Sequence, residues 1–260
     1  MILKIFWNQM HINNYLKHLI KIIIMAKIKR IDKTTFKLLS AIILALSFID
    51  AYFLLKYDNF SQLFWFCNTA LLLLAFGLFF EKSVAITGVF IGALVVQIPW
   101  VLDFLVRLIF GYSLFGVADY MFEYGFNNAR FYVELDHLLI IPISIYGIKK
   151  LGFHKYGWVF ASIVAIILNT GAYLSSSDLD NVNCVFYSCF SEKINLKPSP
   201  LIYLIEWTLS ICILLYIVNL VVYKILSSRI KNKPKNKFKK IFAISQKAVQ
   251  EVQKIMHYRR

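Results

Sequence analysis

The sequence lacks the polar stripe that marks the helices of water-soluble bundles. Its longest apolar segments, such as LLSAIILALSFIDAYFLL at residues 38–55, have no polar face, and 59% of all residues are hydrophobic. A soluble helix would carry polar residues on one face at the helical period. The absence of that pattern excludes a soluble helical domain. It predicts an all-α bundle of membrane-spanning helices, since a bilayer core of about 30 Å needs about 20 apolar residues per helix.

The sequence also lacks the short motifs that would identify a reaction. It contains no HExxH, no Walker motif, no GxSxG elbow and no glycine-rich phosphate loop. Each of these motifs positions groups for one kind of chemistry, so it gives no support to zinc proteases, P-loop proteins or α/β-hydrolases. Gly88 and Gly92, four residues apart, are better explained by close packing of one helix on another.

Hydropathy predicts six membrane spans. They lie at residues 38–55, 62–80, 84–102, 135–148, 157–174 and 201–223. The segment 104–126, between the third and fourth spans, is too polar and too interrupted by glycine to cross a membrane, yet too aromatic for a free loop. We expect it to be re-entrant or to lie at the membrane interface.

Lysine and arginine are scarce on one side of the predicted spans, and this asymmetry indicates which side of the membrane each loop faces. With the N-terminus inside, the inner segments hold 24 of the 29 Lys and Arg residues. Positive residues favour the cytoplasmic side, so we predict a bacterial inner-membrane protein with both termini in the cytoplasm. Residues 1–37 are then a basic cytoplasmic segment, 38–223 the six-span domain with an outer loop near 175–200, and 224–260 a basic tail.

The net charge of +15 follows from this placement. A nucleic-acid-binding protein would present its basic residues on an exposed folded face, whereas here they flank spans, so no nucleic-acid partner is expected. In the tail, apolar residues recur at steps of three and four from Ile241 to Met256. This pattern predicts an amphipathic helix on the anionic lipids of the inner leaflet, and a plain solubilising tail is the alternative.

Polar side chains inside the predicted spans fall almost entirely in the outer halves. A charged residue at mid-bilayer costs about 2.5–3.5 kcal/mol on the insertion scale, so such residues face protein or water. Because all six spans place them at the same end, we predict one outward-facing polar pocket. Its predicted members are Asp50, Cys67, Asn68, Gln97, Asp103, Arg107, His137, Asn181, Asn183 and Glu206.

Asp103 and Arg107 are four residues apart with the acid first, which is the favourable order for a helical ion pair. Pro99 is expected to kink the same helix. The pair either walls a cavity or simply neutralises itself where the helix leaves the hydrocarbon.

His137 is the strongest single candidate for a catalytic, metal-binding or proton-transfer residue. An imidazole among Asp50, Asp103 and Glu206 would suit a metal ligand, a general base or a proton relay. A histidine hydrogen-bonded at the headgroup level is the simpler alternative. We take His137 and Asp103 as the candidate catalytic pair.

The chain has only four cysteines. Cys67 and Cys212 fall within predicted spans, where a thiol is usually a small core residue. Cys184 and Cys189 share the outer loop, where an oxidising compartment would allow a disulfide, with free thiols as the alternative. Their spacing matches no zinc motif.

The stretches FWFCNTALLLLAFGL, VVQIPWVLDFL, GVADYMF, LDHLLIIPISIYG and NVNCVF occur in this order. Over about residues 62–190 the chain resembles a group of small bacterial inner-membrane proteins of uncharacterised function. Their pattern reads W-x-C-[DN], W-x-x-D-F, a His opening the next span, and N-x-N-x-V-F, and Asn68 departs from the commoner Asp. The resemblance implies the fold and a shared outer site, but no reaction. That site comprises Cys67, Asn68, Asp103, His137, Asn181 and Asn183.

Three classes of function fit these observations. The outer pocket binds or processes a lipid or other small amphiphile, or the polar cluster only holds together a structural or assembly protein. The third class is a small-solute transporter. Transport predicts a polar path through both leaflets, often with symmetric broken helices. The inner halves of the spans are almost purely apolar, so transport is the least favoured.

Overall fold

The computed structural model describes residues 33–58, 60–126, 128–189 and 199–231. The predicted amphipathic helix after Ile241 and most of the basic N-terminal segment lie outside these residues. The chain divides into two units, residues 1–219 and 220–260, and the first unit contains the cavity and the site described below. Its described residues form helices and connecting turns, with no strand, which confirms the predicted all-α class.

Five helices in the described residues are long and apolar enough to cross a membrane, which supports a membrane protein. The lengths agree with five of the six predicted spans, although most run a few residues further. These helices are Lys33–Tyr57, α3 (Ser83–Phe110), the run Ala129–Leu151, α7 (Gly157–Ser175) and the apolar part, Pro200–Leu226, of α8 (Pro200–Lys231).

The second predicted span is divided. Residues 62–80 fall into a short 3-10 helix, η1 (Phe60–Phe64), and the α-helix α2 (Phe66–Phe79). At about 1.5 Å per residue, the 14 residues of α2 span about 21 Å, less than the hydrocarbon core. Trp65 and η1 extend this apolar segment beyond the N-terminal end of α2.

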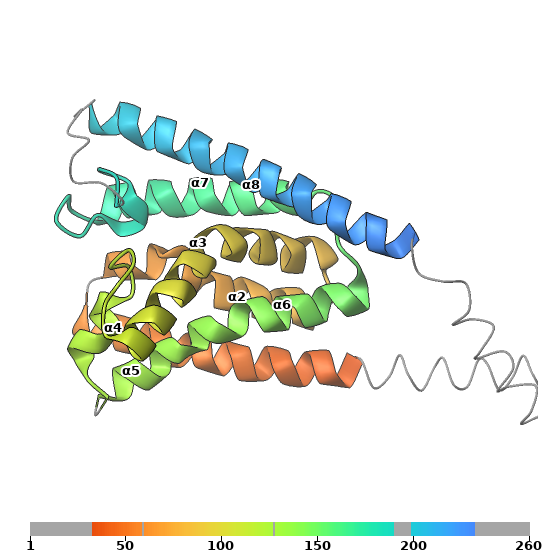
Figure 1. The fold of residues 1–260 in the computed structure, drawn as a ribbon, viewed down its shortest axis with the longest axis horizontal. Coiled ribbons are helices and arrows are strands. Elements are labelled where there is room, and N and C mark those ends of the chain that lie inside the picture. The colour runs from red at the N-terminus through yellow and green to blue at the C-terminus, as the bar shows by residue number, and fades with distance from the viewer. Residues whose placement is uncertain (1–32, 59, 127, 190–198, 232–260) are drawn as a thin grey trace, which may run out of the picture. The chain divides into compact units, whose positions relative to one another are not determined.

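The predicted separate segment 104–126 is partly wrong, because α3 continues to Phe110 before it ends at Gly111, whose φ of 80° is left-handed. The chain then turns back through α4 (Asp119–Tyr124) and α5 (Ala129–Val133). The 3-10 helix η2 (Glu134–Asp136) joins α5 to α6 (His137–Leu151). Figure 1 shows α4, α5 and the loop that contains η3 (Val182–Cys184) at one end of the long helices. We call this the polar end.

Packing is closest around α3, which contacts α2, α6 and α7. A Cβ atom on Gly88 would lie 2.5 Å from the Phe160 ring of α7, and one on Gly92 would lie 2.1 Å from the Phe66 ring of α2. The prediction of close helix packing at both glycines is confirmed. The core around α2, α3 and α6 is apolar, and its fully buried residues include Leu71, Leu74, Leu78, Ile86 and Ile140.

The helix α8 is packed more loosely than the others. Only 11% of its most apolar window is buried, against 44% for α3 and for α7. Hydrogen bonds to the bundle occur at wide intervals, from Asn169 Nδ2 to Thr208 Oγ1 (3.0 Å) and from Asn219 Nδ2 to the Lys155 carbonyl (3.2 Å). A helix held in this way leaves room along its inner side.

Candidate functional site

A cavity of about 730 Å³ lies along the inner side of α8. Its volume lies within the range of about 300–1,000 Å³ typical of small-molecule sites. The long walls are apolar and come from α3, α7 and α8, with Val95, Val96, Ala161, Ala165, Leu168, Ile211, Leu214 and Leu215. Polar side chains line its polar end, namely Asp58, Gln62, Cys67, Asn68, Gln97, Tyr120, Arg130, Glu134 and His137.

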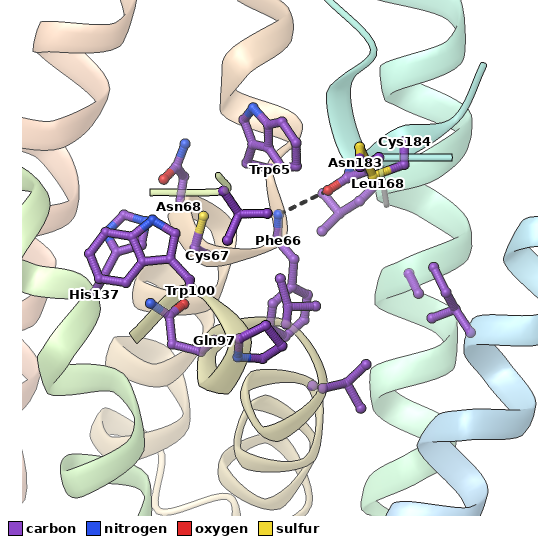
Figure 2. Close-up of a pocket in the computed structure, with 18 of the residues that line it drawn as sticks. Trp65, Phe66, Cys67, Asn68, Gln97, Trp100, His137, Leu168, Asn183 and Cys184 are labelled. Atoms are coloured by element: carbon purple, nitrogen blue, oxygen red, sulfur yellow. Dashed lines mark hydrogen bonds between the residues drawn. A yellow bond between two sulfur atoms is a disulfide. The ribbon is translucent and has the colours of Figure 1, made fainter. Parts of the chain in front are cut away.

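Half of the predicted pocket residues line this cavity. In Figure 2, one side holds Cys67, Asn68, Gln97 and His137, and the other holds Asn183. Four different elements supply them, α2, α3, α6 and η3. Residues that are far apart in the chain, but that were predicted to lie at a similar depth, therefore line the same cavity.

Asp103 does not line the cavity, and it is not part of a site with His137. Its buried carboxylate accepts backbone N–H bonds from Leu114 (2.7 Å), Phe115 (2.9 Å) and Ala118 (2.9 Å). Those residues follow α3, so Asp103 holds the returning chain against the helix that it has just left. Phe115 and the two residues after it line the cavity, which makes Asp103 a support for the wall and not a catalytic group.

The predicted pair of Asp103 with Arg107 does not form. Arg107 instead forms an ion pair with Asp119 and donates to Ser113 Oγ at 2.9 Å. The three N–H groups that Asp103 receives are better partners for a buried carboxylate than one half-exposed guanidinium, because they satisfy both of its oxygens without a second charge. Arg107 lies outside the cavity lining.

The remaining predicted members are also placed outside the lining. Glu206 is exposed on α8. Asp50 is buried behind the cavity, near Glu134 and His137, and its Oδ1 has no hydrogen-bond partner among the described residues. Asn181 lies inside the loop after α7, where its side chain bonds the backbone of Phe186 and Tyr187.

His137 is held on two sides at the polar end. Its Nδ1 lies 2.8 Å from Asp136 Oδ1 and 3.8 Å from Glu134 Oε2. The Trp100 ring stacks on the imidazole, with the ring centroids 4.9 Å apart. The Cys67 thiol lies beside the same ring and interacts with it. His137 is therefore a buried imidazole that is oriented by its protein neighbours.

A hydrogen-bonded chain runs from Trp100 into the acidic cluster. Trp100 Nε1 donates to Tyr120 Oη (3.1 Å), and Tyr120 Oη donates to Glu134 Oε2 (3.2 Å). Arg130 forms an ion pair with Asp58, and its Nε lies 3.8 Å from Glu134 Oε1. Among the described residues, acids outnumber bases here, since Asp50, Asp58, Glu134 and Asp136 lie around Arg130 and His137. Buried ionisable groups are expensive in a membrane bundle, which makes this cluster a candidate functional region.

The loop after α7 holds the start of α2. Asn183 Nδ2 donates to the Phe64 carbonyl (2.7 Å). Its Oδ1 accepts the Phe66 N–H (3.4 Å), the bond that is dashed in Figure 2. Trp207 Nε1 from α8 donates to the Asn183 carbonyl at 2.8 Å. A disulfide joins Cys184 to Cys189, and both cysteines line the cavity. This loop thus positions the residues that flank Cys67.

Sequence reasoning missed Tyr120, Arg130, Glu134 and Asp58 as cavity residues. One signal was available, because the run ELDH places two acids within three residues of His137. Tyr120 and Asp58 gave no local signal, since they reach the cavity only through the fold.

Within the described part of the chain, no three His, Cys, Asp or Glu side chains converge in a way that would hold a metal ion. The site offers instead a thiol, an imidazole, carboxylates and amides beside an apolar hollow. No protein-family model, no curated protein and no solved structure matches this chain. Its function therefore has to be inferred from the cavity.

Proposed function

We propose that this chain is a multi-pass protein of the bacterial inner membrane, with both termini in the cytoplasm, whose outward-facing cavity binds a lipid or other small amphiphile. The observation that carries the proposal is the division of the cavity lining. Apolar side chains of α3, α7 and α8 form most of its length, interrupted by Asn169 on α7 and Ser210 on α8, and most of the polar side chains come from elements at the polar end. An amphiphile is divided in a similar way, into a long apolar part and a polar group at one end.

The loose packing of α8 supports entry from the bilayer. Val96 on α3 and Leu214 on α8 both line the cavity, yet they are 39% and 43% exposed. Cavity-lining side chains with this much accessible surface are compatible with an opening between α3 and α8. An acyl chain can enter between these helices while its polar part moves to the end near His137.

A purely structural role explains less of the geometry. Protein interiors are close-packed, and a scaffold needs no hollow of this size. Asp103 shows how this chain builds a purely structural contact, with every oxygen bonded to backbone and no contact with the cavity. The basic tail, residues 224–260, is proposed to contact anionic lipids of the inner leaflet.

The proposal is tested by placing a large side chain in the cavity from its α7 wall. Ala165 and Ile166 are neighbours on α7, but Ala165 lines the cavity whereas Ile166 is 49% exposed on the outer side of the helix. Each is replaced by Trp, and lipid that co-purifies in mild detergent is extracted and quantified per chain by mass spectrometry.

We expect the wild type and Ile166→Trp to retain one lipid class in similar amounts. Ala165→Trp should retain about 5- to 150-fold less, because overpacking a filled site costs about 1–3 kcal/mol. Equal retention by all three proteins, or none by the folded wild type, would contradict the proposal and favour the structural alternative.

A further inference from the structure

Three side chains at the polar end have the arrangement of a nucleophile, a base and an orienting carboxylate. Cys67 is a free, half-buried thiol in the cavity lining. His137 lies beside it, and Asp136 lies 2.8 Å from the Nδ1 atom of that imidazole. Because Asp136 engages Nδ1, Nε2 is the nitrogen that remains for the thiol proton.

The position of Cys67 on its helix favours the thiolate. Cys67 is the second residue of α2, and the N-terminal turn of a helix presents partial positive charge and N–H groups to an anion. Thiolates are stabilised at such ends and beside an imidazole. The bonds from Asn183 to Phe66 and Phe64 hold this turn at the cavity.

Gln97 provides an independent sign of a ligand. Its side chain is only 1% exposed and lines the same cavity, yet its Nε2 has no hydrogen-bond partner among the described residues. A buried donor without an acceptor costs about 1–3 kcal/mol. An oxygen atom of a bound molecule would satisfy it, and Figure 2 shows Gln97 on the same side of the cavity as Cys67 and His137.

We propose that Cys67 is a nucleophile that accepts an acyl group from an ester-linked lipid in the cavity, with His137 as its base and Gln97 as the donor to the oxyanion. This inference rests on the proposed amphiphile site and names its reaction. Asp136 acts through His137 and is a positioning residue. The apolar walls would hold the acyl chain, which brings the ester carbonyl to the polar end.

The first step transfers the thiol proton to Nε2 of His137 while the sulfur attacks the carbonyl carbon. The tetrahedral oxyanion accepts the N–H of Gln97 Nε2, as in other acyl-transfer sites. The C–O bond to the lipid alcohol then breaks, and the leaving alkoxide takes the proton from His137. In the second step water or another alcohol, deprotonated by His137, attacks the thioester, and Cys67 recovers its proton from His137 as the acid or new ester leaves.

The experiment follows the covalent intermediate directly. The full chain is placed in nanodiscs of phosphatidylethanolamine and phosphatidylglycerol with deuterated oleoyl chains, incubated, quenched in acid and digested. Mass spectrometry of the Cys67 peptide should show a deuterated oleoyl adduct that hydroxylamine removes, which identifies a thioester. Cys67→Ser, a single-atom change that keeps the fold, should give no hydroxylamine-labile adduct.

Matched variants assign the roles. His137→Gln should slow adduct formation by about 100-fold or more, as expected for loss of a general base. Gln97→Leu should slow it by about 100-fold, as for loss of one oxyanion donor. Asp136→Asn should slow it while leaving the bound lipid unchanged, a split that a merely structural defect would not give. Cys212→Ala removes the other free thiol, which lies outside the cavity lining, and should change nothing.

Two results would overturn the inference. One is an unmodified Cys67 in protein that still retains lipid, which would leave the binding site standing and remove only the reaction. The other is a peptide in which Cys67 is linked to Cys184 or Cys189, which would indicate thiol–disulfide exchange at the cavity. A wild type with neither lipid nor adduct would instead reject the proposed function itself.

Discussion

The role of Asp103 gives the most quantitative test of the fold around the cavity. In Asp103→Asn, the amide oxygen can still accept from Leu114 and Phe115, but the amide nitrogen would face the Ala118 N–H. Two donors would then oppose each other in a buried position. One unsatisfied buried group costs about 1–3 kcal/mol, which corresponds to about a 5- to 150-fold change in the local opening equilibrium.

Chymotrypsin cleavage within residues 110–118 measures that opening. Tyr112 and Phe115 are both more than half exposed on this turn, so cleavage reports how often the turn leaves the bundle. When opening and closing are fast relative to cleavage, the cleavage rate follows the open population. We expect Asp103→Asn to be cut about 5 to 150 times faster than the wild type, in line with the same cost.

Arg107→Gln is the control, because the Arg107–Asp119 pair is about one-third exposed and such pairs contribute about 0–1 kcal/mol. It should change cleavage only a few-fold at most. If Asp103→Asn is cleaved at the wild-type rate, the carboxylate does not hold the turn. If Arg107→Gln is the more sensitive of the two, the ion pair and not Asp103 fastens the turn.

The remaining predictions concern the same wall and the residues around it. Asn183→Ala should lower the free energy of unfolding in mixed micelles by about 1–3 kcal/mol, because it leaves the Phe66 N–H and the Phe64 carbonyl without their partner. Gly92→Ala should lower it by about 1–3 kcal/mol in the same titration, because the new methyl group would lie 2.1 Å from the Phe66 ring. Glu206→Gln should change neither lipid retention nor unfolding, because that side chain is exposed; a loss of lipid would contradict its placement.

Hydropathy was enough to predict the class of this protein and most helix boundaries, because membrane insertion depends on local composition. It did not predict that α2 is short, since the apolar run from Leu63 to Phe80 continues through the break at Trp65. The residues on either side of that break, Phe64 and Phe66, are hydrogen-bonded to Asn183, more than 100 residues away in the chain. Only the folded bundle brings it there.

The depth of a polar residue was also predictable, but its direction was not. Cys67, Gln97 and His137 share both a depth and a cavity, whereas Glu206 shares the depth and faces outward. Position along a helix sets height in the membrane, and the rotation of each helix is set by packing. The spacing of Asp103 and Arg107 allowed an ion pair, yet backbone donors 11 to 15 residues later form the actual contact.

The most direct test of the amphiphile cavity is an experimental structure of the full chain in lipid nanodiscs. We predict elongated density between α3, α7 and α8, with its polar end within hydrogen-bonding distance of Gln97 Nε2 and next to Cys67. A hollow closed by α8 packing directly onto α7, or one filled only by ordered water, would contradict the proposed binding of a lipid.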